Sequence, residues 1–102
     1  MNIPIEYFHN ILRSALRHDD EITYLGNASE EGSILNGKIT FEINSLVYTF
    51  KYDSGELERV DSVHDLDGLE LYVETEEENS ELNKFLSPKE IDELQYKLEE
   101  SI

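Results

Sequence analysis

Carboxylates are the side chains in this sequence whose number and spacing could do chemistry. The 102 residues include 24 Asp and Glu against 8 Lys and Arg, which gives a formal net charge of −16 at pH 7. Dense carboxylates can serve as general acids and bases, hold a hard cation, or present a charged surface to a basic partner. Each of these roles requires different neighbouring residues.

The string that most resembles a metal site runs from Val63 to Glu74. Laid over a calcium-binding loop, Asp65, Asp67 and Glu74 take the third, fifth and twelfth positions. The first position, where Asp is usual, holds Val63, and the eighth, where an apolar residue is usual, holds Glu70. Because the flanking residues alternate like strands rather than helices, we expect an exposed acidic turn here and no metal site.

Signals of enzymatic activity are weak. The chain contains no HExxH, no GxSxG and no glycine-rich phosphate loop. It has no Cys, and His9 and His18 are nine residues apart, which places them on opposite sides of one helix. A carboxylate pair could serve a glycosidase, but a domain of 102 residues offers little room for a sugar cleft. We therefore expect no enzymatic activity and no cofactor.

The negative charge is unevenly placed along the chain. Residues 1–18 hold one acid and two bases, whereas residues 19–102 hold 23 acids and 6 bases. Five of the eight residues from Glu74 to Glu81 are Glu. A small domain needs a net charge of only about 2 to 8 for solubility, and a larger charge opposes compaction. The surplus therefore predicts a binding surface, which we place on the outer face of the sheet and on the Glu74–Glu81 segment.

Rows of carboxylates on strands could imitate a DNA backbone. Side chains on one face of a strand repeat about every 6.6 Å, roughly twice the spacing of phosphates along one DNA strand. Clustering selects these candidate partner-binding residues: Glu56, Glu58, Asp65, Asp67, Glu70, Glu74, Glu76, Glu77, Glu78 and Glu81. Helix carboxylates could extend such rows, namely Glu90 with Glu93 and Asp92 with Glu99.

The elements that must position these carboxylates follow from apolar periodicity. An apolar stripe from Ile5 to Leu16 at helical spacing predicts an N-terminal helix, and the capping box Ser87-Pro88-Lys89-Glu90 begins a C-terminal helix. Alternating residues predict strands over 21–25, 38–43, 46–52, 57–63 and 69–75. Short connections favour antiparallel neighbours, so the simplest topology is a meander.

We therefore predict one acidic α+β domain over residues 1–102. It comprises an N-terminal helix, an antiparallel β-meander of four to five strands and a C-terminal helix. In the last strand we expect Leu71 and Val73, together with Leu69, to face the core. Tyr72 is expected to face outward; Val47 and Val60 also lie off the main apolar stripe, so these three residues could cover a second face or form a homodimer contact.

The chain combines five features: a short length, no Cys, a high negative charge, a predicted meander between two helices, and an acidic run from Glu70 to Glu81. Together they resemble the small acidic DNA-mimic proteins of bacteriophages. This class includes anti-restriction and anti-CRISPR inhibitors, and the T-even phage anti-restriction type is similar to this chain in size. The resemblance implies a non-enzymatic protein that binds the DNA-binding face of a restriction nuclease, CRISPR effector or nucleoid protein, often as a dimer.

The partner that we predict is a basic DNA-binding protein. So acidic a chain is a poor ligand for nucleic acid or for an anionic membrane, because phosphate contacts need Lys and Arg. The alternatives are an immunity protein that neutralises a basic toxin such as a nuclease, an acidic adaptor domain, and a merely solvated acidic face. The chain shows no membrane span and no signal peptide, so we expect a cytoplasmic protein, in the host cell if phage-encoded.

Overall fold

The computed structural model describes residues 3–27, 36–75 and 80–102, and it confirms the α+β arrangement. The candidate residues Glu76, Glu77 and Glu78 lie outside the described ranges. In chain order the elements are α1 (Ile5–His18), β1 (Ile22–Asn27), β2 (Asn36–Ile43), β3 (Leu46–Asp53), β4 (Glu56–Asp65), β5 (Glu70–Val73), the 3-10 helix η1 (Leu82–Lys84) and α2 (Pro88–Glu100).

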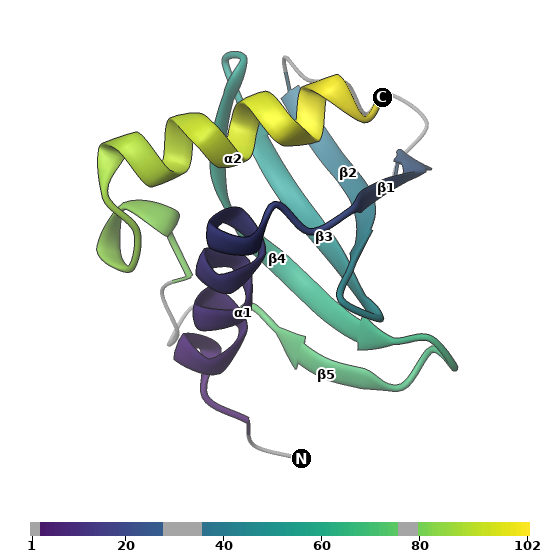
Figure 1. The fold of residues 1–102 in the computed structure, drawn as a ribbon. Coiled ribbons are helices and arrows are strands. Elements are labelled where there is room, and N and C mark those ends of the chain that lie inside the picture. The colour runs from purple at the N-terminus through teal and green to yellow at the C-terminus, as the bar shows by residue number, and fades with distance from the viewer. Residues whose placement is uncertain (1–2, 28–35, 76–79) are drawn as a thin grey trace.

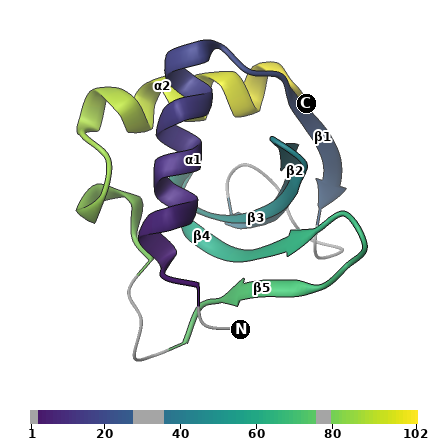
Figure 2. The same cartoon turned by 60° about the horizontal axis from the view of Figure 1, so that its bottom comes forward.

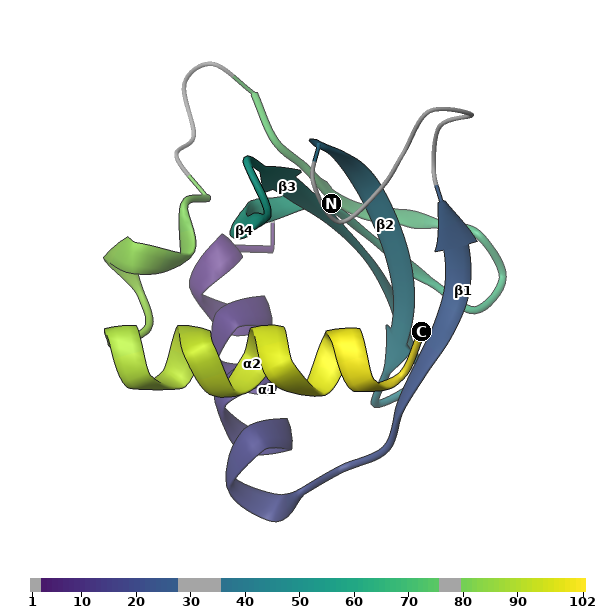
Figure 3. The ribbon, with the colours of Figure 1, turned by 90° about the horizontal axis from the view of Figure 1, so that it is seen from above.

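The five strands form one antiparallel sheet in the order β1-β2-β3-β4-β5, which is the meander that the short connections predicted. The sheet is strongly curved (Figure 2 and Figure 3). Both helices cover its concave face, where α2 crosses α1 (Figure 1). The hydrophobic core lies between the helices and this face.

Two tight turns fix the central hairpins. Asn44 and Ser45 connect β2 to β3 with φ values of 51° and 64°, and Ser54 and Gly55 connect β3 to β4 with φ values of 53° and 81°. Two successive left-handed residues match the right-handed twist of the flanking strands. Both turns stand where the sequence predicted a break.

The apolar face of β4 follows a three-residue spacing because the strand is bulged. The register against β3 shifts by one residue at two places, so Glu58 and Asp61 have no direct partner across the pair. Leu57, Val60 and Val63 are therefore all buried on the inner face. The prediction that Val60 lies off the main apolar stripe was wrong, since each extra residue of a bulge shifts the alternation.

The last strand faces the opposite way from the prediction. Tyr72 is buried and packs beside Phe8, with ring centroids 6.3 Å apart, whereas Val73 is exposed. Leu71 is half-buried and Leu69 is exposed. Tyr72 pairs with the buried Val63 across β4 and β5, and this register places its side chain on the core face. A one-residue slip turns every following side chain to the other face of a sheet.

The helices meet the sheet through fully buried side chains. Phe8 and Leu12 of α1, together with Leu94 and Leu98 of α2, have no exposed surface. The Tyr48 hydroxyl donates a hydrogen bond of 2.9 Å to the Phe8 carbonyl oxygen, so this buried core ring is also held at its polar end. No helix in the described ranges is long and apolar enough to cross a membrane.

The capping box at the start of α2 is confirmed. The Glu90 amide donates to the Ser87 hydroxyl at 3.2 Å, and the Ser87 amide donates to the Glu90 carboxylate at 2.9 Å. Hydrogen bonding by the Ser87 backbone, supported by Arg13, lowers the pKa of Glu90. Arg13 of α1 pairs with Glu90 at 3.0 Å, which joins the two helices.

Candidate functional site

An acidic groove lies between α2 and the turn that joins β3 to β4. It consists of two adjoining hollows of about 370 and 480 Å³, which share Glu56, Leu57, Asn83 and Ile91. The acidic groove is lined by Asp53, Glu56, Leu57, Glu58, Glu81, Asn83, Pro88, Ile91, Asp92, Gln95, Tyr96 and Glu99. Six of these residues are carboxylates, and none is Lys or Arg.

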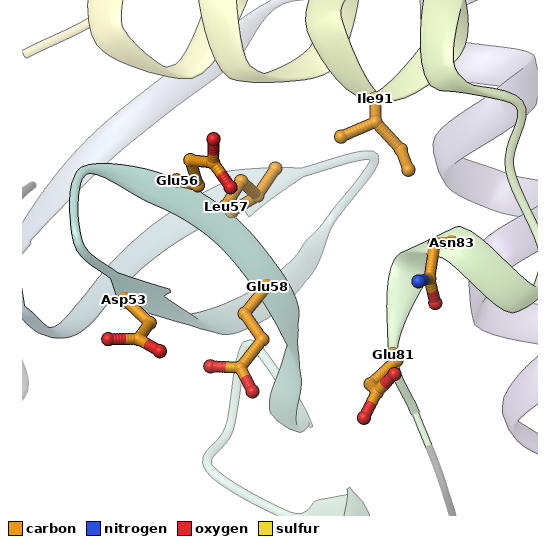
Figure 4. A pocket seen from close by; sticks show the side chains of 7 residues that line it. All are labelled: Asp53, Glu56, Leu57, Glu58, Glu81, Asn83 and Ile91. Atoms are coloured by element: carbon orange, nitrogen blue, oxygen red, sulfur yellow. The ribbon is translucent and has the colours of Figure 1, made fainter.

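Three segments that are distant in sequence form the smaller hollow (Figure 4). Glu58 stands on β4, Asn83 and Glu81 stand across from it, and Ile91 projects from α2. The meander and the crossing of α2 over the sheet bring these segments together, so no local sequence pattern predicts the groove.

The α2 wall of the groove follows from helical spacing. Its residues are three or four positions apart and therefore share one side of the helix: Pro88, Ile91, Asp92, Gln95, Tyr96 and Glu99. The adjacent side carries Leu94 and Leu98, which are buried against the sheet. One amphipathic helix thus supplies both core contacts and a wall with charged, amide and aromatic side chains.

Gln95 fixes the distance between the two walls. Its amide nitrogen donates to the Gly55 carbonyl oxygen at 3.0 Å, and its amide oxygen accepts from the Leu57 amide at 3.2 Å. Both backbone groups belong to the start of β4 and the turn before it. The side chain therefore ties α2 to the β3–β4 turn and holds the groove open at a set width.

The carboxylates of the groove differ in what they already contact. Glu58 pairs with Arg59 at 3.3 Å, and Glu99 accepts a hydrogen bond from Gln95 at 3.3 Å. Within the described part of the chain, the exposed carboxylates of Glu56 and Asp92 form neither an ion pair nor a hydrogen bond. Unpaired charges of one sign in a hollow raise the local potential and attract a cationic partner.

A buried phenol lies behind the groove. Tyr52, which pairs with Leu57 across β3 and β4, is fully buried, and its hydroxyl has no hydrogen-bond partner among the described residues. Burial raises the pKa of Tyr52 far above its usual range, and the negative charge of Glu99 adds to the rise. Tyr52 is therefore a neutral donor close to a carboxylate of the groove wall.

The structure divides the candidate residues selected by clustering. Glu56, Glu58 and Glu81 meet in the acidic groove. Glu74 instead forms an ion pair with Arg59, which also holds Glu58. Arg59 therefore engages two carboxylates that the sequence had assigned to a partner.

The remaining described candidates lie at the far end of β4, on the hairpin that leads into β5. The Asp65 carboxylate accepts hydrogen bonds from the backbone amides of Asp67 and Leu69, at 2.9 and 2.8 Å. Asp65 thus shapes the turn, whereas Asp67 and Glu70 are exposed. Within the described ranges, no three carboxylates or imidazoles gather closely enough to hold a metal ion.

The outer face of the sheet carries mixed charge rather than an acidic row. Lys38, Lys51 and Arg59 are direct neighbours across β2, β3 and β4, so three cations form one row. Asp61 pairs with Lys38 at 3.3 Å. Cations directly opposite one another repel, and the neighbouring carboxylates offset that repulsion. The described part of this face therefore carries a row of cations among its carboxylates, and its role as an acidic recognition surface stays a prediction.

Sequence reasoning missed Asp53 and the apolar part of the groove. It did name Asp92 with Glu99 as an extension of the acidic rows, and both line the groove. It also named Glu90 with Glu93, but Glu90 is engaged by the helix cap and by Arg13. Helical spacing within α2 was the sequence signal that could locate the α2 wall of the groove. No such signal existed for the β4 wall, because its contact with α2 joins residues far apart in the chain.

Comparison of the chain with protein families, with curated proteins and with solved structures finds no match.

Proposed function

We propose that the protein is a non-enzymatic inhibitor whose negatively charged surface occupies the DNA-binding site of a basic protein. The class of partner is a restriction nuclease, a CRISPR effector or a nucleoid protein. The observation that carries the proposal is the acidic groove, which is lined by six carboxylates, one of them (Glu58) paired with Arg59, and by no basic side chain. A surface that binds DNA through Lys and Arg is complementary to such a groove.

The ion pairs of the described residues support this proposal. Five of the described carboxylates form ion pairs with four of the eight bases, so most acids in the described ranges lie outside these ion pairs. Exposed charges steer an oppositely charged partner and make association fast and sensitive to salt. Binding by this mechanism weakens as ionic strength rises, because charges are screened beyond about 8 Å at physiological salt.

The test is an affinity capture from bacterial lysate with the whole protein as immobilised bait. Bound proteins are eluted in salt steps, or with duplex DNA, and identified by mass spectrometry. We expect DNA-binding proteins that moderate salt releases and that duplex DNA displaces. The purified captured protein should then lose DNA binding in a mobility-shift assay when this protein is added.

Two results would contradict the proposal. An empty eluate would mean that the charge only solvates the surface. Capture of one dedicated partner that duplex DNA does not displace would instead favour an immunity or adaptor role. A control bait in which Glu56→Gln and Asp92→Asn remove the two unpaired carboxylates should retain less of the DNA-binding proteins at the same salt concentration.

A further inference from the structure

The acidic groove has an apolar floor as well as an acidic lining. Leu57 is 6% exposed and Ile91 is half-buried, whereas the Tyr96 side chain is 66% exposed beside them. Pro88 completes the apolar part of the larger hollow. A bare phosphate-like surface would not need these residues, so the floor specifies more about the occupant than charge alone.

We propose that the acidic groove receives a segment of the partner protein in which Arg side chains stand next to apolar side chains. This inference rests on the proposed function and names the part of the partner that the groove would hold. The apolar side chains of the segment would cover Leu57 and Ile91, and the Arg side chains would reach the carboxylates of both walls.

Charge complementarity favours Arg at this place. Glu56 on the β4 wall and Asp92 on the α2 wall have no cation of their own among the described residues. Guanidinium offers five donors in a planar fork that suits carboxylates, and its aliphatic stem covers apolar surface. Lys presents a compact, strongly hydrated charge that fits a half-apolar hollow less well.

The aromatic ring on the α2 wall adds a second contact for guanidinium. Tyr96 follows Asp92 by four residues and precedes Glu99 by three, so the exposed ring stands between two carboxylates on one side of the helix. Arg stacks on aromatic faces while its donors reach acceptors at the ring edge. Asp92, Tyr96 and Glu99 thus form a recognition stripe for Arg.

The buried Tyr52 hydroxyl is an independent sign of incomplete bonding behind the same wall. It is fully buried, lacks a hydrogen-bond partner among the described residues, and lies within the electrostatic influence of Glu99. Buried polar groups are nearly always hydrogen-bonded in folded proteins. Tyr52 lines neither hollow, so this hydroxyl lies in the core behind the groove and makes no contact with the segment.

The first experiment compares two synthetic peptides of equal charge by isothermal titration calorimetry. Both are twelve residues long with blocked ends; one repeats Arg-Leu-Ser and the other repeats Arg-Ser-Ser. We expect the Leu-containing peptide to bind roughly tenfold more tightly, because it can bury apolar side chains on the groove floor. Equal affinity for the two peptides, or no binding of either, would overturn the inference.

A matched pair of variants locates the binding. The groove variant combines Glu56→Gln with Asp92→Asn, and the control combines Glu70→Gln with Asp67→Asn on the β4–β5 hairpin. All four residues are exposed, and each variant removes one Glu and one Asp charge. We expect the groove variant to weaken binding of the Leu-containing peptide by roughly tenfold and the control to change it by less than about twofold. Equal losses would show long-range attraction only and would contradict the proposal.

A second matched pair tests the aromatic contact. Tyr96→Ala should weaken binding of the Leu-containing peptide by about threefold to tenfold, since a cation–π contact contributes at this scale. Tyr7→Ala, at an exposed position on α1, should leave the affinity unchanged. Thermal unfolding of every variant confirms that it is folded. A Tyr96→Ala variant that binds as the unaltered protein does would remove the ring from the site.

The two proposals fail in different ways. If the peptides bind the groove as expected but lysate yields no DNA-displaced partner, the groove recognises a basic segment and the inhibitor function is wrong. If DNA-binding proteins are captured but the peptide and variant results go against the groove, the function stands and the place of contact is wrong.

Discussion

The two ends of β4 are both acidic, and at the β3–β4 end the described residues line a hollow fit for a partner. At the β4–β5 hairpin, Asp65 is engaged by the backbone of its own turn, and Asp67 points into solvent. At the β3–β4 turn, Glu56 faces a helix wall that adds Asp92 and an apolar floor. The density of acidic residues along the sequence is similar at the two ends of β4. The two ends differ in the side chains that surround these carboxylates in the fold.

Arg59 shows the same point within a single strand. It lies between the two ends of β4 and pairs with Glu58 and Glu74. Two carboxylates that look available in the sequence thus already share one guanidinium in the fold. A surface built to bind a cation has to be located by the carboxylates that remain without one.

The largest difference between the two ends should appear when their apolar residues are truncated. Leu98→Ala, in the fully buried face of α2 behind the groove, should lower the free energy of unfolding by about 2 to 5 kcal/mol because it leaves a cavity. Leu66→Ala, at the 59% exposed tip of the hairpin, should change it by less than about 0.5 kcal/mol. Urea denaturation of both variants measures the contrast, and similar losses would contradict it.

A smaller contrast is expected for the polar side chains that hold each end. Gln95→Ala leaves the Leu57 amide and the Gly55 carbonyl without their partner and should cost about 1 to 3 kcal/mol. Asp65→Ala removes two bonds at an exposed turn where water can replace them, so about 1 kcal/mol or less is lost. The rate of hydrogen exchange at the Leu57 amide should rise sharply only in the Gln95→Ala variant. Unchanged protection of this amide in that variant would contradict the role of Gln95 in tying α2 to the β3–β4 turn.

The smallest predicted effect is the change in the free energy of unfolding with pH that comes from His9 on α1. His9 is 2% exposed and stacks on Phe85 with ring centroids 4.2 Å apart. Burial lowers the pKa of His9, and Arg13 adds to this, whereas hydrogen bonds to the backbone of Ile5 and Ser80 oppose it. The unfolded state therefore takes up a proton that the folded state resists, so this contribution to stability is lost as pH falls below about 6.5.

The measurement is the free energy of unfolding from pH 7.5 to pH 5 for the unaltered protein and for His9→Gln. We expect the variant to show the shallower loss on acidification, because it lacks the titrating group. Comparing the two slopes cancels the general relief of charge repulsion that acid brings to this chain. Identical slopes would show that His9 titrates the same way folded and unfolded.

Much of the fold could be predicted from local pattern. Period-2 alternation located the strands, the box from Ser87 to Glu90 fixed the start of α2, and turn residues such as Asn44 and Gly55 separated the hairpins. Half of the site was also accessible, since helical spacing placed Asp92 and Glu99 on one side of α2. These signals depend only on residues close in sequence, which is why they held.

What the sequence by itself determined is the order and type of the elements, the meander and the large surplus of negative charge. The tertiary structure alone decided which way Val60 and Tyr72 face, because bulges and pairing register both depend on the partner strand. It also decided which carboxylates Arg59 contacts and which ones line the acidic groove together. Those pairings join residues far apart in the chain, so no local periodicity encodes them.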